Sequence, residues 1–225
     1  MPRPPVRPGG RHDLVDADLV RQLVEGAGLA RGALVVDVGA GTGAITVELV
    51  AAGARVVAVE LDRVRVAALR DRVVDDPVSI VHGDLRRVPF PRDPYRIVAN
   101  PPFHLTADLL GRLLDRPGRG AGRGLVRADL VLQRAAAARV ADDARPSGLR
   151  WAPWFDLRVA APVPRRAFRP VPTVDASILV VDRRVEPLLP AAEAERWRRF
   201  VTANAARWGG SDRRLRWWLR RYRRG

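Results

Sequence analysis

The stretch Leu34-Val35-Val36-Asp37-Val38-Gly39-Ala40-Gly41-Thr42-Gly43-Ala44-Ile45-Thr46 decides the fold of this 225-residue chain. It is typical of a buried strand, a glycine turn and the start of a helix. Glycine lets the backbone approach a ligand closely, and it stands here at positions 39, 41 and 43. About twenty residues further on, the apolar strand 55–60 ends in Glu60. A carboxylate at that place can hold the hydroxyl groups of a ribose.

Strands and helices alternate outward from this stretch. We expect strands at 34–38, 55–60, 78–82 and 95–99, and helices at 13–28, 44–52, 62–74 and 104–115. Such βαβ units predict a parallel sheet with helices on both faces, an α/β fold of the Rossmann-like type. Downstream we expect a strand at 125–132, a helix at 133–141, and a final pair of strands at 154–160 and 177–181. We then expect a helix at 191–208, a break at Gly209-Gly210, and a second helix that Ser211 caps.

The chemistry is indicated by Ala99-Asn100-Pro101-Pro102-Phe103-His104-Leu105, which follows the buried strand 95–99. An exocyclic amine is a poor nucleophile because its lone pair is delocalised into the ring. If the Asn100 side-chain oxygen and the Pro101 carbonyl accept its two hydrogens, the lone pair is freed for attack. Phe103 can stack on the flipped base and face the methyl group. The alternative is a plain turn held by two prolines.

A third strand end distinguishes between two cofactor classes. The strand 78–82 is followed by Gly83 and Asp84, so three polar strand ends meet at one sheet edge. This set fits S-adenosylmethionine, with Asp84 accepting a hydrogen bond from the adenine amino group and Glu60 holding the ribose. A nicotinamide enzyme is the alternative, because Gly39, Gly41 and Ala44 satisfy the permissive dinucleotide pattern. Each acid could also be an exposed strand end or a helix cap.

The chain resembles the ribosomal RNA adenine N6-methyltransferases, and their erythromycin-resistance branch more than the small-subunit dimethylase branch. The motifs that carry the resemblance are Asp37 to Gly43, Val59-Glu60-Leu61-Asp62, Gly83-Asp84-Leu85, Ala99 to Leu105, and Phe168 to Ser177. The resemblance covers roughly residues 10 to 185 and implies that S-adenosyl-L-methionine is the cofactor. It implies catalytic roles for Asn100, Pro101 and Phe103, and cofactor contacts from Asp37, Gly39, Gly41, Gly43, Glu60, Leu61, Asp84, Leu85 and Asn100.

Two departures from the family are visible. The family carries a Gln-Asn-Phe-Leu stretch near its amino terminus, and Arg11-His12-Asp13-Leu14 stands there in this chain. We therefore expect the family's asparagine contact to pass to His12, and we expect Leu14 to contact the cofactor as well. The part after residue 187 is shorter than the helical domain of the family, so the grip on RNA is expected to differ.

Composition favours a nucleic-acid partner. The formal net charge is +15, and all 40 basic residues are arginine, a side chain that pairs bidentately with phosphate. The resemblance to the family implies that the basic loop around residues 165–169 borders the target-base pocket. We expect RNA contacts from this loop and from a basic, aromatic helix after 211, namely Arg165, Arg166, Phe168, Arg213, Arg214, Arg216 and Arg220. The structural alternatives to RNA contact are that Phe168 anchors its loop and that Trp217 or Trp218 packs on the protein. The composition of the Gly/Arg loop 116–124 predicts a surface linker, with an RNA contact as the alternative.

Other partners are not indicated. There is no cysteine, the three histidines show no metal spacing, and no run of apolar residues approaches the length of a membrane span. We therefore expect a cytoplasmic protein without metal or membrane contact, and a monomer. We divide the chain into a flexible basic arm (1–11), a catalytic domain (12–186) and a small basic helical region (187–225).

The expected function is methylation of N6 of an adenine in 23S ribosomal RNA, which gives resistance to macrolide-type antibiotics. One alternative changes the target to small-subunit RNA, DNA adenine or a protein glutamine. A second alternative is a non-catalytic RNA-binding assembly factor on the same fold.

Overall fold

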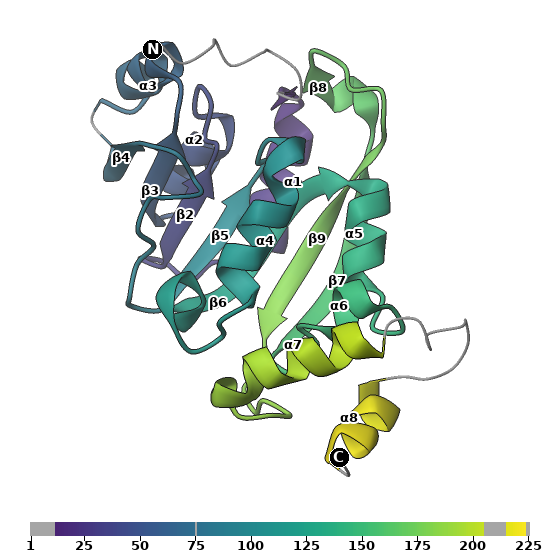
Figure 1. Ribbon diagram of the computed structural model, residues 1–225. Helices are drawn as coiled ribbons and strands as arrows, with labels where there is room; N and C mark the ends of the chain where they lie inside the picture. The colour runs from purple at the N-terminus through teal and green to yellow at the C-terminus, as the bar shows by residue number, and fades with distance from the viewer. Residues whose placement is uncertain (1–11, 75, 205–214, 224–225) are drawn as a thin grey trace, which may run out of the picture.

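The computed structural model describes residues 12–74, 76–204 and 215–223 (Figure 1). Its centre is a seven-stranded sheet of order β4-β3-β2-β5-β6-β9-β7. The strands are β2 (Leu34–Val38), β3 (Arg55–Glu60), β4 (Val78–His82), β5 (Tyr95–Ala99), β6 (Leu125–Gln133), β7 (Phe155–Val163) and β9 (Ala176–Arg183). This is the predicted Rossmann-like sheet, but it is mixed, because β9 runs antiparallel to both β6 and β7 while the other neighbours are parallel.

Helices cover both faces of the sheet (Figure 1). They are α1 (Ala17–Gly26), α2 (Ala44–Ala51), α3 (Arg63–Arg72), α4 (Thr106–Leu114), α5 (Arg134–Ala141), α6 (Pro146–Leu149), α7 (Ala194–Ala203) and α8 (Leu215–Arg223). Strand residues alternate between two hydrophobic clusters. Val36 and Ile97 belong to a cluster that also includes residues of α4, α7 and α8, whereas Val35 and Val98 belong to a cluster that includes residues of α1 and α2. The alternation follows from the period of two along a strand, which sends successive side chains to opposite faces.

The amino-terminal helix starts later than the sequence pattern predicts. Asp13–Leu14 form a short strand, β1, that pairs antiparallel with β8 (Phe168–Arg169) in a separate two-stranded sheet. Asp16 then caps α1 by accepting a hydrogen bond from the backbone nitrogen of Leu19 at 3.2 Å, a type of contact that stabilises a helix by about 1 kcal/mol. Asp13 and Leu14 therefore belong to a strand paired with β8, and not to the helix predicted over 13–28.

The segment after β5 combines prolines with a short 3₁₀ turn. The turn η1 (Phe103–Leu105) follows Pro101 and Pro102, and α4 begins at Thr106, so the predicted helix 104–115 is shorter than expected. The Thr106 hydroxyl donates to the Phe103 carbonyl at 2.9 Å. Proline is disfavoured in the interior of a helix, so α4 cannot extend backwards through Pro101 and Pro102.

The C-terminal helices lie at the end of the sheet away from Asn100 (Figure 1). This follows from the strand directions, because β9 is antiparallel to β6 and Asp182 pairs with Arg127 near the start of β6. The side chains of Trp197 on α7 and Trp218 on α8 are almost fully buried. Both belong to the hydrophobic cluster on that face of the sheet. The packing predicted for one of the two adjacent tryptophans is thus seen at Trp218.

The helix predicted over 191–208 is a 3₁₀ turn, η4 (Ala191–Glu193), followed by α7. Its expected last residues, the Gly209-Gly210 break and the Ser211 cap lie outside the described residues. The division at residue 187 stays a prediction, although α7 and α8 share a hydrophobic cluster with the sheet.

The Gly/Arg loop 116–124 is held against the sheet. It contains the 3₁₀ turn η2 (Gly120–Arg123). Arg183 at the end of β9 donates to the carbonyl groups of Pro117 (2.8 Å) and Gly122, and the Tyr95 hydroxyl donates to Ala121 at 2.6 Å. Two side chains from inside the fold therefore tie down a segment that the sequence presents as a plain linker.

Among the described helices, none has the length and apolar character needed to cross a membrane.

Candidate active site

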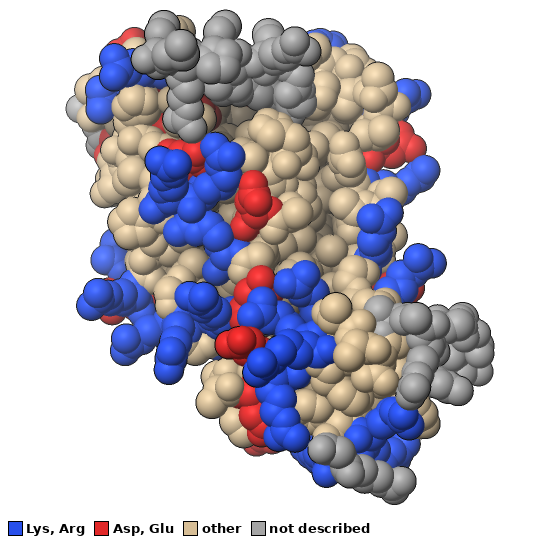
Figure 2. Space-filling model, in the orientation of Figure 1, with Lys and Arg blue, Asp and Glu red and all other residues tan. Residues whose placement is uncertain are grey.

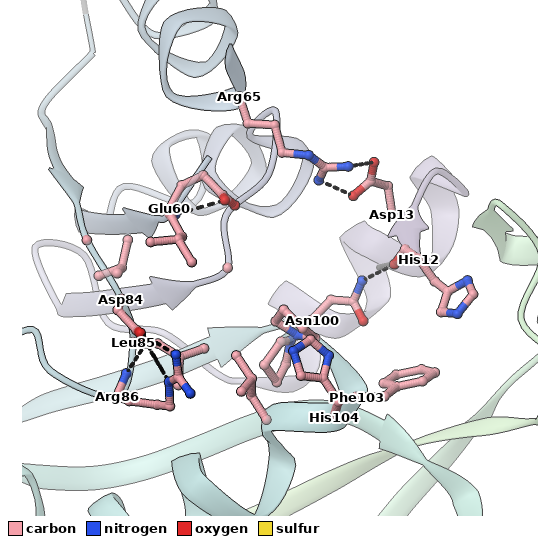
Figure 3. Close-up of a pocket in the computed structure, with 17 residues that line it drawn as sticks. His12, Asp13, Glu60, Arg65, Asp84, Leu85, Arg86, Asn100, Phe103 and His104 are labelled. Atoms are coloured by element: carbon pink, nitrogen blue, oxygen red, sulfur yellow. Dashed lines mark hydrogen bonds and ion pairs between the residues drawn. The ribbon is translucent and has the colours of Figure 1, made fainter. Parts of the chain in front are cut away.

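A cleft of about 900 Å³, counting the space at its mouth, lies at the carboxyl ends of β2, β3 and β5. Figure 3 shows that it gathers side chains from the predicted motifs, with Glu60, Asp84 and Asn100 placed around one space. The prediction that these polar strand ends meet is therefore confirmed.

The glycine turn packs directly against the segment after β5. Gly39 has a φ of 76°, in the left-handed region that side chains disfavour. A Cβ atom on Gly39 would lie 3.0 Å from Cδ of Pro102.

Gly43 allows close packing with α3, because a Cβ atom at this position would lie 2.5 Å from Cδ1 of Leu69. Beside the cleft lies a second cavity, called the adjoining cavity here, whose lining includes Leu14, Asp37 and Gly41. Gly43 lines neither of the two spaces. The structure therefore corrects its expected cofactor contact to a packing role.

Glu60 holds the turn in place. Its carboxylate accepts hydrogen bonds from the backbone nitrogens of Gly41 (2.9 Å), Leu61 (2.8 Å) and Asp62 (2.8 Å). The side chain is buried at the end of β3. Its Oε2 accepts one of these bonds and can accept another, because a carboxylate oxygen has two lone pairs. Glu60 can therefore position the glycine turn and still bind a hydroxyl group.

Asp84 forms an ion pair with Arg86, a residue that was not among the predicted site residues. Nη2 of Arg86 lies 2.6 Å from Oδ2 of Asp84, and Nε lies 3.0 Å from Oδ1. This ion pair lowers the pKa of Asp84 to about 2, so the carboxylate stays charged at neutral pH. A signal was available, because an aspartate often accepts a bond from the backbone nitrogen two residues on, as Asp84 does from Arg86 at 2.9 Å. Leu61 and Leu85 add apolar walls to this part of the cleft.

Asn100 has one satisfied end and one free end. Its Nδ2 donates to the backbone carbonyl of His12 at 2.8 Å, whereas its Oδ1 is buried without a hydrogen-bond partner among the described residues. Figure 3 shows the amide beside Phe103 and His12. Buried acceptors are rarely left unpaired. An unpaired oxygen in a cleft therefore indicates a place for a donor from a ligand.

The His12 ring lies beside Phe103, with 5.7 Å between the ring centroids. Its Nδ1 is 2.7 Å from the carbonyl oxygen of Pro170, so it links the amino-terminal segment to the loop after β8. His12 lines the cleft, and Leu14 lines the adjoining cavity. His12 is the residue that we expected to take over the family's asparagine contact, and Leu14 is the second cofactor contact expected from this stretch.

The Phe103 ring is supported from behind by Phe168. The two centroids are 6.2 Å apart in an edge-to-face arrangement at 74°. Phe168 is completely buried. The structure therefore corrects the expectation that Phe168 stacks on RNA, because its ring has no free face. Arg165 and Arg166, in the turn just before it, are exposed, and Arg165 lies 3.5 Å from a carboxylate oxygen of Asp175.

Asp37 lies under the glycine turn in the adjoining cavity, which also includes Gly39 and Asn100. Its Oδ2 accepts a bond from the Thr46 hydroxyl at 2.8 Å, and its Oδ1 is buried without a partner among the described residues. Burial raises the pKa of Asp37 to about 7, with a smaller contribution from nearby Glu60. A cation bound nearby would favour the charged form of this carboxyl.

These features fit S-adenosylmethionine, which carries a sulfonium and an ammonium group. The cleft offers carboxylates at Glu60 and Asp84, apolar walls at Leu61 and Leu85, and a glycine turn. The free oxygen of Asn100 stands where an amine could be received. The fold and the site are those of the S-adenosylmethionine-dependent methyltransferase class.

Comparison with known proteins identifies the family. The family model "Ribosomal RNA adenine dimethylase" matches residues 10–208. The chain is 38% identical over 186 residues to the mycinamicin-resistance protein MyrB of Micromonospora griseorubida, covering 80% of this chain and 58% of that protein. It is 35% identical over 212 residues to ribosomal RNA small subunit methyltransferase A of Leifsonia xyli subsp. xyli, covering 90% and 74%.

A solved structure described as 23S rRNA methyltransferase ErmE superimposes with a TM-score of 0.76 at 29% identity, covering 92% of this chain and 83% of that one. The chain belongs to the ribosomal RNA adenine dimethylase family, whose members are rRNA adenine N6-methyltransferases. It spans little more than half the length of MyrB.

Proposed function

We propose that this protein transfers methyl groups from S-adenosylmethionine to N6 of an adenine in 23S ribosomal RNA. The observation that carries the proposal is the unpaired, buried Oδ1 of Asn100 in a cleft that also holds Phe103 and the strand-end carboxylates. The choice of 23S RNA is supported by the similarity to MyrB, named for mycinamicin resistance, and to ErmE, described as a 23S rRNA methyltransferase. Resistance to macrolide-type antibiotics is the corresponding biological role.

In the proposed mechanism, Asn100 acts first on the target amine. Its Nδ2 is already engaged by His12 at 2.8 Å, so the amide presents its oxygen to the substrate. That oxygen and the Pro101 carbonyl accept the two amine hydrogens, which draws the nitrogen lone pair out of the ring. Phe103, backed by Phe168, stacks on the base and holds it in position. S-adenosylmethionine supplies the electrophilic methyl group. S-adenosylhomocysteine is then the leaving group, and the methylated amine loses its proton to solvent, so no side chain is required as general base.

Cofactor binding is assigned to the remaining residues of the cleft. Glu60 holds the ribose hydroxyls through the acceptor capacity left on Oε2. Asp84, whose pKa the ion pair with Arg86 lowers further, accepts a hydrogen bond from the adenine amino group, and the adenine lies between Leu61 and Leu85. The glycine turn at Gly39 and Gly41, His12, Leu14 and the buried Asp37 complete the site on its other side.

RNA contact is proposed at two places. Figure 2 shows arginines spread over one face of the molecule, including the region of α7 and α8. On α8, Arg216 and Arg220 are exposed, while the other side of the helix packs inward. Arg165 and Arg166 provide a second contact near Phe168. Arg213 and Arg214, also expected to bind RNA, lie outside the described residues. Because α8 and the cleft are at opposite ends of the sheet, the RNA must extend along the protein to reach both.

A second candidate target is small-subunit ribosomal RNA. It is favoured by the 35% identity to the Leifsonia protein over 90% of this chain. Both candidates use the same site, so the RNA itself must decide between them. We also propose a cytoplasmic location, where ribosomal RNA is found, and we keep the prediction of a monomer.

The test uses purified protein, S-adenosylmethionine labelled in its methyl group, and separate 23S and 16S RNA. After digestion, label in N6-methylated adenosine from 23S RNA is the expected result. The Asn100→Ala variant serves as the matched control and should leave both RNAs unlabelled. Label in 16S RNA alone would transfer the activity to the second candidate. Label in neither RNA, with cofactor still bound, would contradict both.

A further inference from the structure

An ion pair crosses the glycine turn of the cleft. Nη1 and Nη2 of Arg65 lie 2.6 and 2.8 Å from the two carboxylate oxygens of Asp13, in a two-pronged arrangement (Figure 3). Arg65 comes from α3 in the main fold, whereas Asp13 comes from β1 in the separate two-stranded sheet. Neither residue was among those selected from the sequence. In the family stretch Gln-Asn-Phe-Leu, Asp13 occupies the place of an apolar residue.

The pair lies directly on the turn. A Cβ atom on Gly41 would be 3.1 Å from Nη1 of Arg65 and 3.5 Å from Oδ1 of Asp13. Both residues line the cleft that holds Glu60 and Asn100, and Asp13 also lines the adjoining cavity with Asp37. The pair therefore stands where these two spaces meet.

The cofactor has three parts that need three places. Its adenosine is assigned to Glu60 and Asp84, and its methyl group must lie near Asn100, where the target amine is received. The remaining methionyl end carries an ammonium and a carboxylate on one carbon atom, so it needs an anion and a cation side by side. Asp13 and Arg65 supply these charges next to the glycine turn. An arginine fork that binds one carboxylate with two bonds has the geometry to bind another.

Exchange of partners is feasible because the pair is not deeply buried. The Arg65 side chain is 25% exposed and that of Asp13 is 40% exposed. Ion pairs exposed to solvent contribute little to folding stability. If the ligand supplied both opposite charges, neither residue would be left unpaired.

We propose that Asp13 and Arg65 form the subsite for the methionyl end of the cofactor. Arg65 binds the α-carboxylate and Asp13 binds the α-ammonium, so the ligand replaces the ion pair seen between them. The proposal depends on S-adenosylmethionine as cofactor and is independent of which RNA is methylated.

The test is calorimetric binding to the whole protein without RNA. S-adenosylhomocysteine carries the complete amino-acid end, whereas 5′-methylthioadenosine lacks it. We expect Arg65→Gln and Asp13→Asn each to weaken S-adenosylhomocysteine about tenfold or more and to change 5′-methylthioadenosine by less than about twofold. Arg63→Gln, which removes an exposed arginine from the same helix, should leave both affinities unchanged.

A third probe separates the two charges. Decarboxylated S-adenosylmethionine keeps the ammonium but lacks the carboxylate, so its affinity should fall with Asp13→Asn and be unaffected by Arg65→Gln. Equal losses for S-adenosylhomocysteine and 5′-methylthioadenosine would show a clasp that merely shapes the cleft and would overturn the proposal. Unchanged affinity for S-adenosylhomocysteine in either variant would overturn it as well. Because RNA is absent, a wrong assignment of the methylated RNA would not affect these results.

Discussion

Asn100 Nδ2 lies 2.8 Å from the backbone carbonyl oxygen of His12, and this contact determines which end of the amide is free. The nitrogen must face the carbonyl, since two acceptors cannot form a hydrogen bond. The oxygen then remains buried and unpaired on the side of the cleft. A backbone atom 88 positions earlier in the chain thus orients the side chain on which the proposed chemistry depends.

Replacing Asn100 by alanine should stop methyl transfer and leave cofactor binding nearly intact. Removal of a single preorganised polar group of this kind typically lowers kcat by about 10²–10³-fold. Single-turnover rates and calorimetric binding of S-adenosylhomocysteine would measure the two effects. His12→Ala keeps the backbone carbonyl and should lose much less activity. A collapse of cofactor affinity in Asn100→Ala would show that Asn100 binds cofactor rather than substrate.

Phe103 is expected to contribute its aromatic face rather than its volume. Alanine is a poor test because deleting a buried phenylalanine costs about 3–5 kcal/mol of stability, and Phe103 packs against Phe168. We therefore propose Phe103→Leu and Phe103→Tyr. Leucine should lose about 1–3 kcal/mol of base stacking, measured as a fall in kcat/KM for RNA. Tyrosine should retain activity, and equal activity in both variants would argue against stacking.

The exposed arginines of α8 can be tested through salt dependence. Deleting the helix would also remove Trp218 from the hydrophobic cluster, so charge substitutions are the better choice. The double variant Arg216→Gln/Arg220→Gln should bind RNA more weakly. The slope of log K against log salt concentration should become shallower by about 0.7–0.9 for each lost phosphate contact. Arg31→Gln/Arg139→Gln removes the same charge from exposed positions elsewhere. If both double variants changed the slope equally, the effect would reflect net charge alone.

Burial of Asp37 makes stability depend on pH. Its pKa is raised to about 7 from an ordinary 3.8, so between these values the folded state binds more protons than the unfolded state. Its contribution to the free energy of unfolding therefore decreases as pH rises from about 4 to about 7, by about 1.4 kcal/mol per pKa unit. Urea unfolding without cofactor should show Asp37→Asn gaining stability relative to the wild type between pH 5 and pH 8. Asp71→Asn, at an exposed position, controls for the loss of a charge. A constant difference between Asp37→Asn and wild type across this range would contradict the raised pKa.

The strand-end residues of the site could be predicted because their meeting is a property of parallel strands. Glu60, Asp84 and Asn100 each end an apolar run, and the carboxyl ends of such strands share one edge. Phe168 could not be placed in this way. Its burial depends on the pairing of β8 with β1, which joins residues more than 150 positions apart. A loop phenylalanine next to arginines has the same local sequence whether its ring faces RNA or the core.

The Asp13–Arg65 pair escaped prediction for a related reason. The two residues are 52 positions apart, with Asp13 on β1 and Arg65 on α3, so no local sequence pattern links them. The available signal was the aspartate at position 13, where the family stretch has an apolar residue. Local patterns thus predict what lies on one element, whereas contacts between distant elements require the fold.

Gly39 should be essential because it lies against the catalytic segment. Its φ of 76° disfavours a side chain, and an added Cβ would press on Cδ of Pro102 at 3.0 Å. Gly28 offers a matched control, since it has a φ of 58° but no atom within 4 Å of an added Cβ. Both Gly39→Ala and Gly28→Ala should lose about 1–2 kcal/mol of stability from backbone strain.

Gly39→Ala alone should also displace Pro102 and with it Asn100. Its kcat should therefore fall at least about tenfold, while Gly28→Ala keeps wild-type kcat. Denaturant unfolding and single-turnover rates on the three proteins would separate strain from contact, and normal turnover by Gly39→Ala would show that the glycine turn does not position the catalytic segment.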